Sequence, residues 1–135
     1  MSSHEVVRRH VDAFNARDEA AEPWSEDAEV IVPGASVSGR EAVLAFLRVF
    51  HDGFPDGRLE LVCVLGSGSR VAAEGRFVGT HTGTLRGAGG SLAPTGREVS
   101  FRWAAVYEVD GSGLRSEHLY FDQVELLSQV GALAD

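Results

Sequence analysis

Over most of this chain the apolar residues follow a helical period before Pro55 and a period of two from Leu59 onward; the exceptions are a short strand pattern at about 26–32 and a helical pattern at about 124–130. Before Pro55, apolar side chains recur three and four positions apart, as they do along one face of an α-helix. From Leu59 onward they mostly alternate with polar residues, as they do along half-buried strands. Helices followed by strands predict one α+β domain over residues 1–135, with helices covering one face of a curved antiparallel sheet.

The boundaries of the expected elements follow from this periodicity and from the residues at its interruptions. Ser2 with Glu5, and Ser38 with Glu41, have the spacing of capping boxes at helix starts. The glycine-rich stretch 83–96 is expected to form a mobile hairpin loop. The expected elements are helices at about 3–16, 17–24, 39–52 and 124–130, and strands at about 26–32, 59–65, 71–80, 99–109 and 114–122.

Composition excludes several classes of partner. The formal net charge is -8, whereas a nucleic-acid-binding protein needs a basic face, so we expect no nucleic-acid partner. The sequence has no apolar run of membrane-spanning length, no basic amphipathic segment and no secretion signal at its start. We therefore expect no membrane association and a cytoplasmic location.

Composition also narrows the possible chemistry. All 12 basic residues are arginines, so a lysine Schiff base, covalently held pyridoxal phosphate and a P-loop are excluded. The lone Cys63 excludes an internal disulfide and a multi-cysteine zinc site. The 5 histidines are dispersed, with no pair at metal-ligand spacing. We expect neither a metal nor a cofactor.

The segment from His118 to Asp122 is the strongest candidate for chemistry. In a strand, His118, Tyr120 and Asp122 would share one face, and Leu119 and Phe121 the other. We expect the polar face to be the inner one, where these groups would handle a proton. Asp122 also precedes a helical pattern, so an ordinary helix cap is the alternative, and one residue can serve both roles.

The partners of Asp122 have alternatives of their own. His118 would orient Asp122, bind a carbonyl oxygen or carry the proton, or it is a half-exposed histidine bonded to its neighbours. Tyr120 would donate a hydrogen bond to an enolate, or it is a pocket wall. We assign both to the candidate site, with Asp122 and His118 as catalytic residues.

Four further residues are candidates for substrate binding. His81 lies between glycines at the expected pocket rim, unless its motif only sets the loop conformation. Arg76 would hold a substrate carboxylate, unless it forms an ion pair across neighbouring strands. Trp24 and Trp103 would be pocket wall, or simply part of the core.

Several short motifs together resemble a known protein family. The motifs are Phe14-Asn15-Ala16-Arg17-Asp18, Gly39-Arg40-Glu41-Ala42, Phe54-Pro55-Asp56, Gly79-Thr80-His81-Thr82-Gly83, Pro94-Thr95-Gly96-Arg97, Tyr120-Phe121-Asp122 and Leu126-Leu127-Ser128-Gln129-Val130-Gly131. In this order and spacing the chain resembles the SnoaL-like polyketide cyclases of the nuclear transport factor 2-like superfamily, over almost its whole length.

The resemblance implies a fold and an activity. The fold is a cone-shaped α+β domain enclosing a pocket and dimerised through the outer face of its sheet. The activity is cofactor-free intramolecular aldol ring closure of polyketides, with an aspartate at the end of the last strand as acid/base, which corresponds to Asp122. The superfamily also includes isomerases, dehydratases, epoxide hydrolases and non-catalytic binders, so fold alone does not decide function.

The leading hypothesis is therefore a SnoaL-like small-molecule enzyme working by acid/base catalysis. Asp122 would remove a proton from a carbon flanked by carbonyls, and His118 or Tyr120 would stabilise the enolate. The alternatives are an isomerase or dehydratase, a non-catalytic binder, and a dimeric interaction module. The expected partners are a small apolar or polycyclic molecule and a second copy of the chain in a homodimer.

Overall fold

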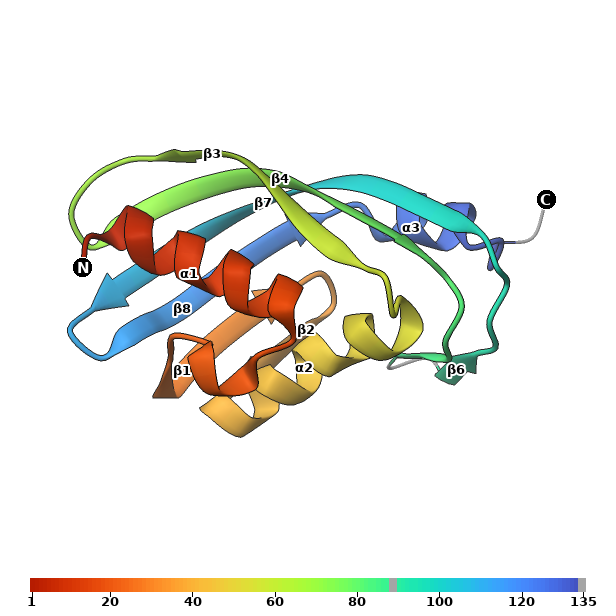
Figure 1. Ribbon diagram of the computed structural model, residues 1–135, viewed down its shortest axis with the longest axis horizontal. Helices are drawn as coiled ribbons and strands as arrows, with labels where there is room; N and C mark the ends of the chain where they lie inside the picture. The colour runs from red at the N-terminus through yellow and green to blue at the C-terminus, as the bar shows by residue number, and fades with distance from the viewer. Residues whose placement is uncertain (88–89, 134–135) are drawn as a thin grey trace.

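Long strands form a curved sheet that arches over two helices (Figure 1). The computed structural model describes residues 1–87 and 90–133. No helix in this part of the chain is both long and apolar enough to cross a membrane. The helical elements are α1 (Ser3–Ala16), the 3-10 turn η1 (Glu19–Ala21), α2 (Arg40–Gly53) and α3 (Gln123–Gln129). The strands are β1 (Trp24–Val32), β2 (Ala35–Ser38), β3 (Arg58–Leu65), β4 (Arg70–Thr80), β5 (Leu85–Gly87), β6 (Gly90–Leu92), β7 (Glu98–Asp110) and β8 (Gly113–Phe121).

The main sheet has the strand order β2-β1-β8-β7-β4-β3. Its neighbours are antiparallel, as the sequence predicts, except that β1 and β8 run parallel. β2 escapes sequence analysis because its four residues are too few and too polar to show a period. Within the stretch 83–96, which was expected to be a mobile hairpin loop, β5 and β6 pair as antiparallel strands; residues 88–89 of that stretch lie outside the described residues.

The starts of the two long helices are held differently. α1 begins as predicted, because the side chain of Ser2 accepts a hydrogen bond from the backbone N–H of Glu5. The capping box predicted at Ser38 is wrong. The N-cap of α2 is Gly39, with φ at 91° and no side-chain cap, a conformation that suits glycine. The backbone N–H of Gly39 donates to the carbonyl of Ala28, 2.8 Å away, and ties α2 to β1.

β7 supplies the central row of the core. Buried and exposed residues alternate along all 13 positions of the strand, so one complete row faces the concave side. The apolar stripes of α1 and α2 pack against that side, and Figure 1 shows the two helices lying beneath the sheet. The buried row consists of Val99, Phe101, Trp103, Ala105, Tyr107 and Val109.

Trp103 lies against β4 at a position that only glycine permits. Gly75 pairs with Trp103 in the register of β4 and β7. A Cβ atom at residue 75 would overlap the indole ring and stand 2.6 Å from the carbonyl oxygen of Glu60. The backbone oxygen cannot move without disturbing the pairing of β3 with β4, so this contact fixes the indole against the sheet.

Replacing Gly75 with alanine is expected to destabilise the fold by about 1–3 kcal/mol, because an added methyl group overpacks a close contact. Gly111 is the matched control, since a Cβ there meets nothing within 4 Å. Urea unfolding of Gly75→Ala and Gly111→Ala measures both changes. Equal stability of the two variants would contradict the assigned role of Gly75.

Candidate active site

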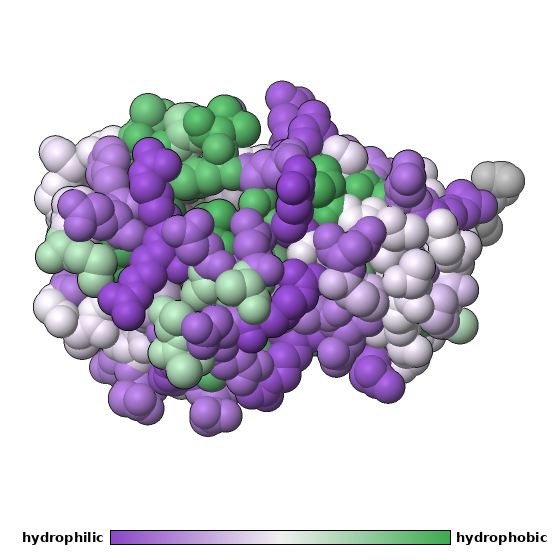
Figure 2. Space-filling model, viewed as in Figure 1, coloured by the Kyte–Doolittle hydropathy of each residue, from purple (hydrophilic) through white to green (hydrophobic). Residues whose placement is uncertain are grey.

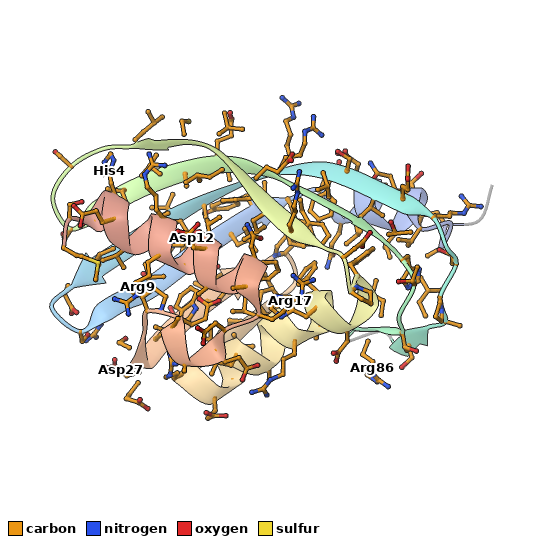
Figure 3. All side chains as sticks on the ribbon, viewed as in Figure 1. His4, Arg9, Asp12, Arg17, Asp27 and Arg86 are labelled. Atoms are coloured by element: carbon orange, nitrogen blue, oxygen red, sulfur yellow. The ribbon has the colours of Figure 1, made fainter. Side chains whose placement is uncertain are left out.

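A cavity lies between the concave face of the sheet and helices α1 and α2. It contains about 480 Å³ of space, part of it open to solvent. Among the described residues no arginine lines it, and in Figure 3 the labelled Asp27 and Arg86 lie at the periphery of the molecule. Most of its wall is aromatic. The phenylalanines that line it are Phe14, Phe46, Phe50, Phe77, Phe101 and Phe121.

A buried histidine–carboxylate pair lies at the cavity wall. Nδ1 of His10, on α1, is 2.6 Å from Oε1 of Glu22, and the indole N–H of Trp24 donates to the same oxygen over 3.0 Å. The exposed fractions of His10 and Glu22 are only 2% and 5%. His10 lines the cavity, and its Nε2 makes no hydrogen bond to any described residue. That nitrogen is therefore available to a ligand.

A second carboxyl group lines the same cavity. Glu117 on β8 is 4% exposed and stands opposite Tyr107 on β7. Burial raises the pKa of Glu117, because the apolar surroundings disfavour its ionised form. Burial likewise raises the pKa of the Tyr107 hydroxyl, which stays protonated and can donate a hydrogen bond.

The pKa of His10 reflects two opposing effects. Burial alone lowers it, because an imidazolium loses its hydration. The nearby carboxyl groups of Glu22 and Glu117, with the hydrogen bond to Glu22, raise it by more, so the pKa lies above its ordinary value of 6.5. The cavity wall thus carries two ionisable groups, Glu117 and His10, whose pKa values are both raised.

Both ionisable groups are buried because they share a face of their helix or strand with apolar residues. His10 lies in the buried stripe of α1 with Val7 and Phe14, at helical spacing. On β8, Glu117 shares its face with Leu119 and Phe121, which also line the cavity. The burial of these apolar side chains determines which face of each element turns inward, and the polar group follows.

The predicted orientation of the last strand is wrong. The cavity face of β8 carries Glu117, Leu119 and Phe121, whereas His118 and Tyr120 lie on the other face, where Tyr120 is 59% exposed. The predicted alternation was correct. The face that turns inward is the one with the apolar side chains, because burying apolar surface is favourable. His118 and Tyr120 are therefore not part of the cavity wall.

Asp122 is an exposed helix cap in this structure. Its carboxylate accepts hydrogen bonds from the backbone N–H groups of Val124 and Glu125, at 2.9 and 3.1 Å, and it does not line the cavity. Of the two interpretations of Asp122 from the sequence, the geometry matches the cap, and its expected place on the cavity face is wrong.

The other predicted binding residues are divided between the cavity and the surface. Trp103 lines the cavity, and its indole N–H is buried without a hydrogen-bond partner among residues 1–87 and 90–133. Trp24 stands behind the wall, bonded to Glu22. Arg76 is exposed and donates to the hydroxyl of Ser100 on the outer face, so its predicted contact with the pocket is wrong.

His81 is buried, but it contacts the segment between β6 and β7 rather than the cavity. Its Nδ1 is 2.9 Å from the hydroxyl oxygen of Thr95, and its backbone N–H donates to the carbonyl of Arg97. Burial lowers the pKa of His81. The structure therefore matches the loop-conformation alternative, and the rim position predicted for His81 is wrong.

Three ionisable residues of the cluster, His10, Glu22 and Glu117, were missed in the sequence. His10 and Glu117 had one detectable signal, an ionisable side chain within an apolar face. Glu22 had none, because it follows a turn and no periodicity links it to His10. No grouping of three histidine, cysteine or carboxylate side chains suited to a metal ion occurs in the described residues.

The sequence matches the family model of the SnoaL-like domain over residues 7–118. No curated protein sequence matches it significantly.

Solved structures of similar fold include a candidate SnoaL-like polyketide cyclase from Jannaschia sp. CCS1. It has 21% sequence identity and a TM-score of 0.84, and the alignment covers 98% of this chain and 93% of that chain. AclR from Streptomyces galilaeus, a candidate hydroxylase, has 23% identity, coverage of 98% and 87%, and a TM-score of 0.81. IdmH from Streptomyces antibioticus, a candidate polyketide cyclase, has 23% identity, coverage of 96% and 98%, and a TM-score of 0.79. At these identities the likeness shows the fold, which is nuclear transport factor 2-like, as predicted.

The raised pKa of Glu117 has a consequence for stability. A carboxyl group whose pKa is higher in the folded than in the unfolded protein stabilises the fold through its protonated form. That contribution is complete below the unfolded value, near 4.5, and is lost as the pH rises through the folded value. We therefore expect the free energy of unfolding to fall as the pH rises above that point, and Glu117→Gln to remove this part of the fall.

Urea unfolding of the parent and of Glu117→Gln, from about pH 4 to about pH 8, measures this effect. Glu108→Gln, at an exposed position of β7, is the control and should keep the parent's slope. His10 adds a similar loss of stability above its ordinary pKa of 6.5, and that loss should persist in Glu117→Gln. If the free energy of unfolding of Glu117→Gln fell as steeply as the parent's between the ordinary pKa values of Glu117 and His10, the assignment would be refuted.

Proposed function

The chain belongs to the SnoaL-like domain family, and on this premise we propose that it is an enzyme that works by acid/base catalysis without a cofactor. The observation that carries the proposal is the buried His10–Glu22 pair, placed with Glu117 on the wall of an aromatic cavity. Ionisable groups with shifted pKa values in an apolar cleft are typical of sites that move protons.

We assign Glu117 as the base and His10, which is held by Glu22, as the acid. The raised pKa of Glu117 makes its ionised form a stronger base, and the neighbouring carboxyl groups stabilise protonated His10. Glu117 would take a proton from a carbon next to a carbonyl group. Nε2–H of His10 would donate to the oxygen on which negative charge develops. Glu22 and the indole of Trp24 keep the imidazole in the required orientation.

Ring closure follows from the same two groups. The C–H bond breaks and its proton moves to Glu117, and the resulting enolate carbon forms a bond to a second carbonyl carbon of the same molecule. When the new alkoxide takes its proton from Glu117, the starting state of both groups is restored. When it takes a proton from His10 instead, the proton on Glu117 passes to His10 and restores the same state. The cavity's contribution is to fold the substrate so that the two carbons meet.

The wall chemistry supports a flat, uncharged substrate. Phenylalanine rings and Trp103 offer apolar faces, and no guanidinium group from the described part of the chain lines the cavity to hold a carboxylate or phosphate. Intramolecular aldol cyclisation of a polyketide is the reaction of this class that the family membership favours. Double-bond isomerisation and dehydration begin with the same proton removal.

We further propose that the outer face of the sheet binds a second copy of the chain. Val106 on β7 and Tyr120 on β8 are exposed on that face, and Val62 and Leu65 are exposed on β3. Figure 2 shows a hydrophobic area near the position of β3, at the upper left of the view. Exposed apolar surface of this kind is a common feature of subunit interfaces.

Proton transfer can be tested without knowing the natural substrate. We expect the protein to catalyse exchange of the α-protons of a bicyclic aromatic ketone such as α-tetralone in deuterium oxide, measured by proton NMR. Glu117→Gln should slow this exchange at least about a hundredfold, because the base is lost. Asp122→Asn keeps the helix cap and should exchange at the parent's rate.

The same measurement as a function of pH should give a bell-shaped profile. Its acidic limb should reflect the pKa of Glu117, which lies above the ordinary value of 4.5. Its alkaline limb should reflect the pKa of His10, which lies above the ordinary value of 6.5. Ketone binding without any exchange would indicate a binding protein rather than an enzyme. Loss of exchange in Asp122→Asn with full exchange in Glu117→Gln would overturn the assignment of the base.

The dimer is tested by light scattering after size-exclusion chromatography. Val106→Arg places a charge in the middle of the outer face and should convert a dimer to a monomer. Val124→Arg, at an exposed position of α3, is the control and should leave the dimer intact. A monomeric parent protein would rule out this proposal at the concentrations used.

A further inference from the structure

We propose that Arg40 is a positioning residue for the His10–Glu22 pair, because its guanidinium group holds the chain segment that presents both the Glu22 carboxylate and the Trp24 indole. The inference rests on the proposed function in one respect, namely that His10 is the acid of the reaction. Arg40 belongs to the motif Gly39-Arg40-Glu41-Ala42, to which the mechanism above assigns no role.

The guanidinium group of Arg40 binds three backbone carbonyl groups of one segment. Nη1 donates to the carbonyl oxygens of Glu22 and Trp24, at 2.9 and 3.2 Å, and Nη2 donates to that of Glu19, at 2.8 Å. The planar fork of an arginine can reach several acceptors at once in a fixed geometry. The bonds therefore hold the main chain on both sides of Glu22.

This segment has little regular structure of its own to hold it. η1 is a single 3-10 turn, a type of element with weak hydrogen-bond geometry. Oε1 of Glu22 nevertheless has to meet two donors at once, the Nδ1 of His10 and the indole N–H of Trp24. Because Arg40 binds the carbonyls of residues 22 and 24, it fixes the backbone of the acceptor and of one of its donors.

The other end of Arg40 is fixed as well. Arg40 is the first residue of α2, and the preceding Gly39 donates from its backbone N–H to the carbonyl of Ala28 on β1. The guanidinium therefore projects from a helix start that is tied to the same strand as Trp24. A positioning group is effective only when its own support is rigid, and this one is held from both sides.

Arg40 acts here through geometry rather than through its charge. Its hydrogen-bond partners are carbonyl oxygens, and no ion pair between Arg40 and a described carboxylate is present. A lysine would keep the positive charge but cannot hold three carbonyls in one plane. Arg40→Lys therefore separates the two explanations.

The test follows the titration of His10 by nitrogen-15 NMR of the imidazole. Arg40→Lys and Arg40→Gln should let the Glu22 carboxylate drift from His10, so that protonated His10 becomes less stable. We expect the ratio of protonated to neutral His10, at a fixed pH near the parent's midpoint, to fall about threefold or more. The alkaline limb of the exchange profile should move to lower pH with it.

Arg48 provides the matched control on the same helix. Its guanidinium binds the side chain of Glu19, at 2.5 and 2.6 Å, but no carbonyl of the segment. Arg48→Gln should therefore leave the His10 titration unchanged. A comparable shift in Arg48→Gln would mean that any loss of a helix arginine disturbs the pair, and would overturn the proposal.

The remaining outcomes each decide the question. An unshifted His10 titration in folded Arg40→Lys would make Arg40 a purely structural residue, as would failure of both Arg40 variants to fold. The titration needs no turnover, so it tests the positioning role even if Glu117→Gln leaves proton exchange intact and the proposed function fails. Conversely, if the His10 titration is unchanged in the Arg40 variants but Glu117→Gln loses proton exchange, the proposed function is supported and the positioning role of Arg40 is not.

Discussion

The pleat of β7 and β8 is the constraint on which the rest of this structure depends. Each strand turns one row of side chains toward the helices and the other toward the outside. The row that turns inward is the one with more apolar surface to bury, since burial of that surface is the main favourable term in folding. The cavity wall, its phenylalanine rings and its one carboxyl group from β8 all follow from that choice.

Burial of ionisable groups is the second consequence of this choice. Glu117 and His10 are buried because they share a face with apolar neighbours, and they lose most of their hydration. This loss costs free energy unless each group has a hydrogen-bonding or charged partner. His10 finds Glu22, which also receives the indole N–H of Trp24. The same desolvation raises the pKa of Glu117, whereas the carboxyl groups near His10 outweigh desolvation and raise its pKa. In this protein, stability and reactivity therefore depend on the same few contacts.

Local features of the sequence were predictable, and contacts across the fold were not. The start of α1 at Ser2 and the alternation along β7 depend on residues a few positions apart, so pattern analysis finds them. The inward face of β8 was predicted wrongly because the polar residues His118, Tyr120 and Asp122 were given more weight than the apolar ones. Leu119 and Phe121, on the opposite face, are the residues that turn inward. The pairing of His10 with Glu22 spans a helix end and a turn, and no period in the sequence connects such positions. Arg40 was visible as part of a motif, but its three acceptors are backbone atoms, which carry no sequence signal.

The two tryptophans of the chain give the site an optical property. Trp24 donates its indole N–H to the carboxylate that holds His10, and the indole of Trp103 forms part of the cavity wall. Both are buried, and the chain contains no others. The intrinsic tryptophan emission of this protein therefore originates entirely beside the cavity. Changes in its occupancy or in the ionisation of its acidic groups act on the two fluorophores directly, without an attached label.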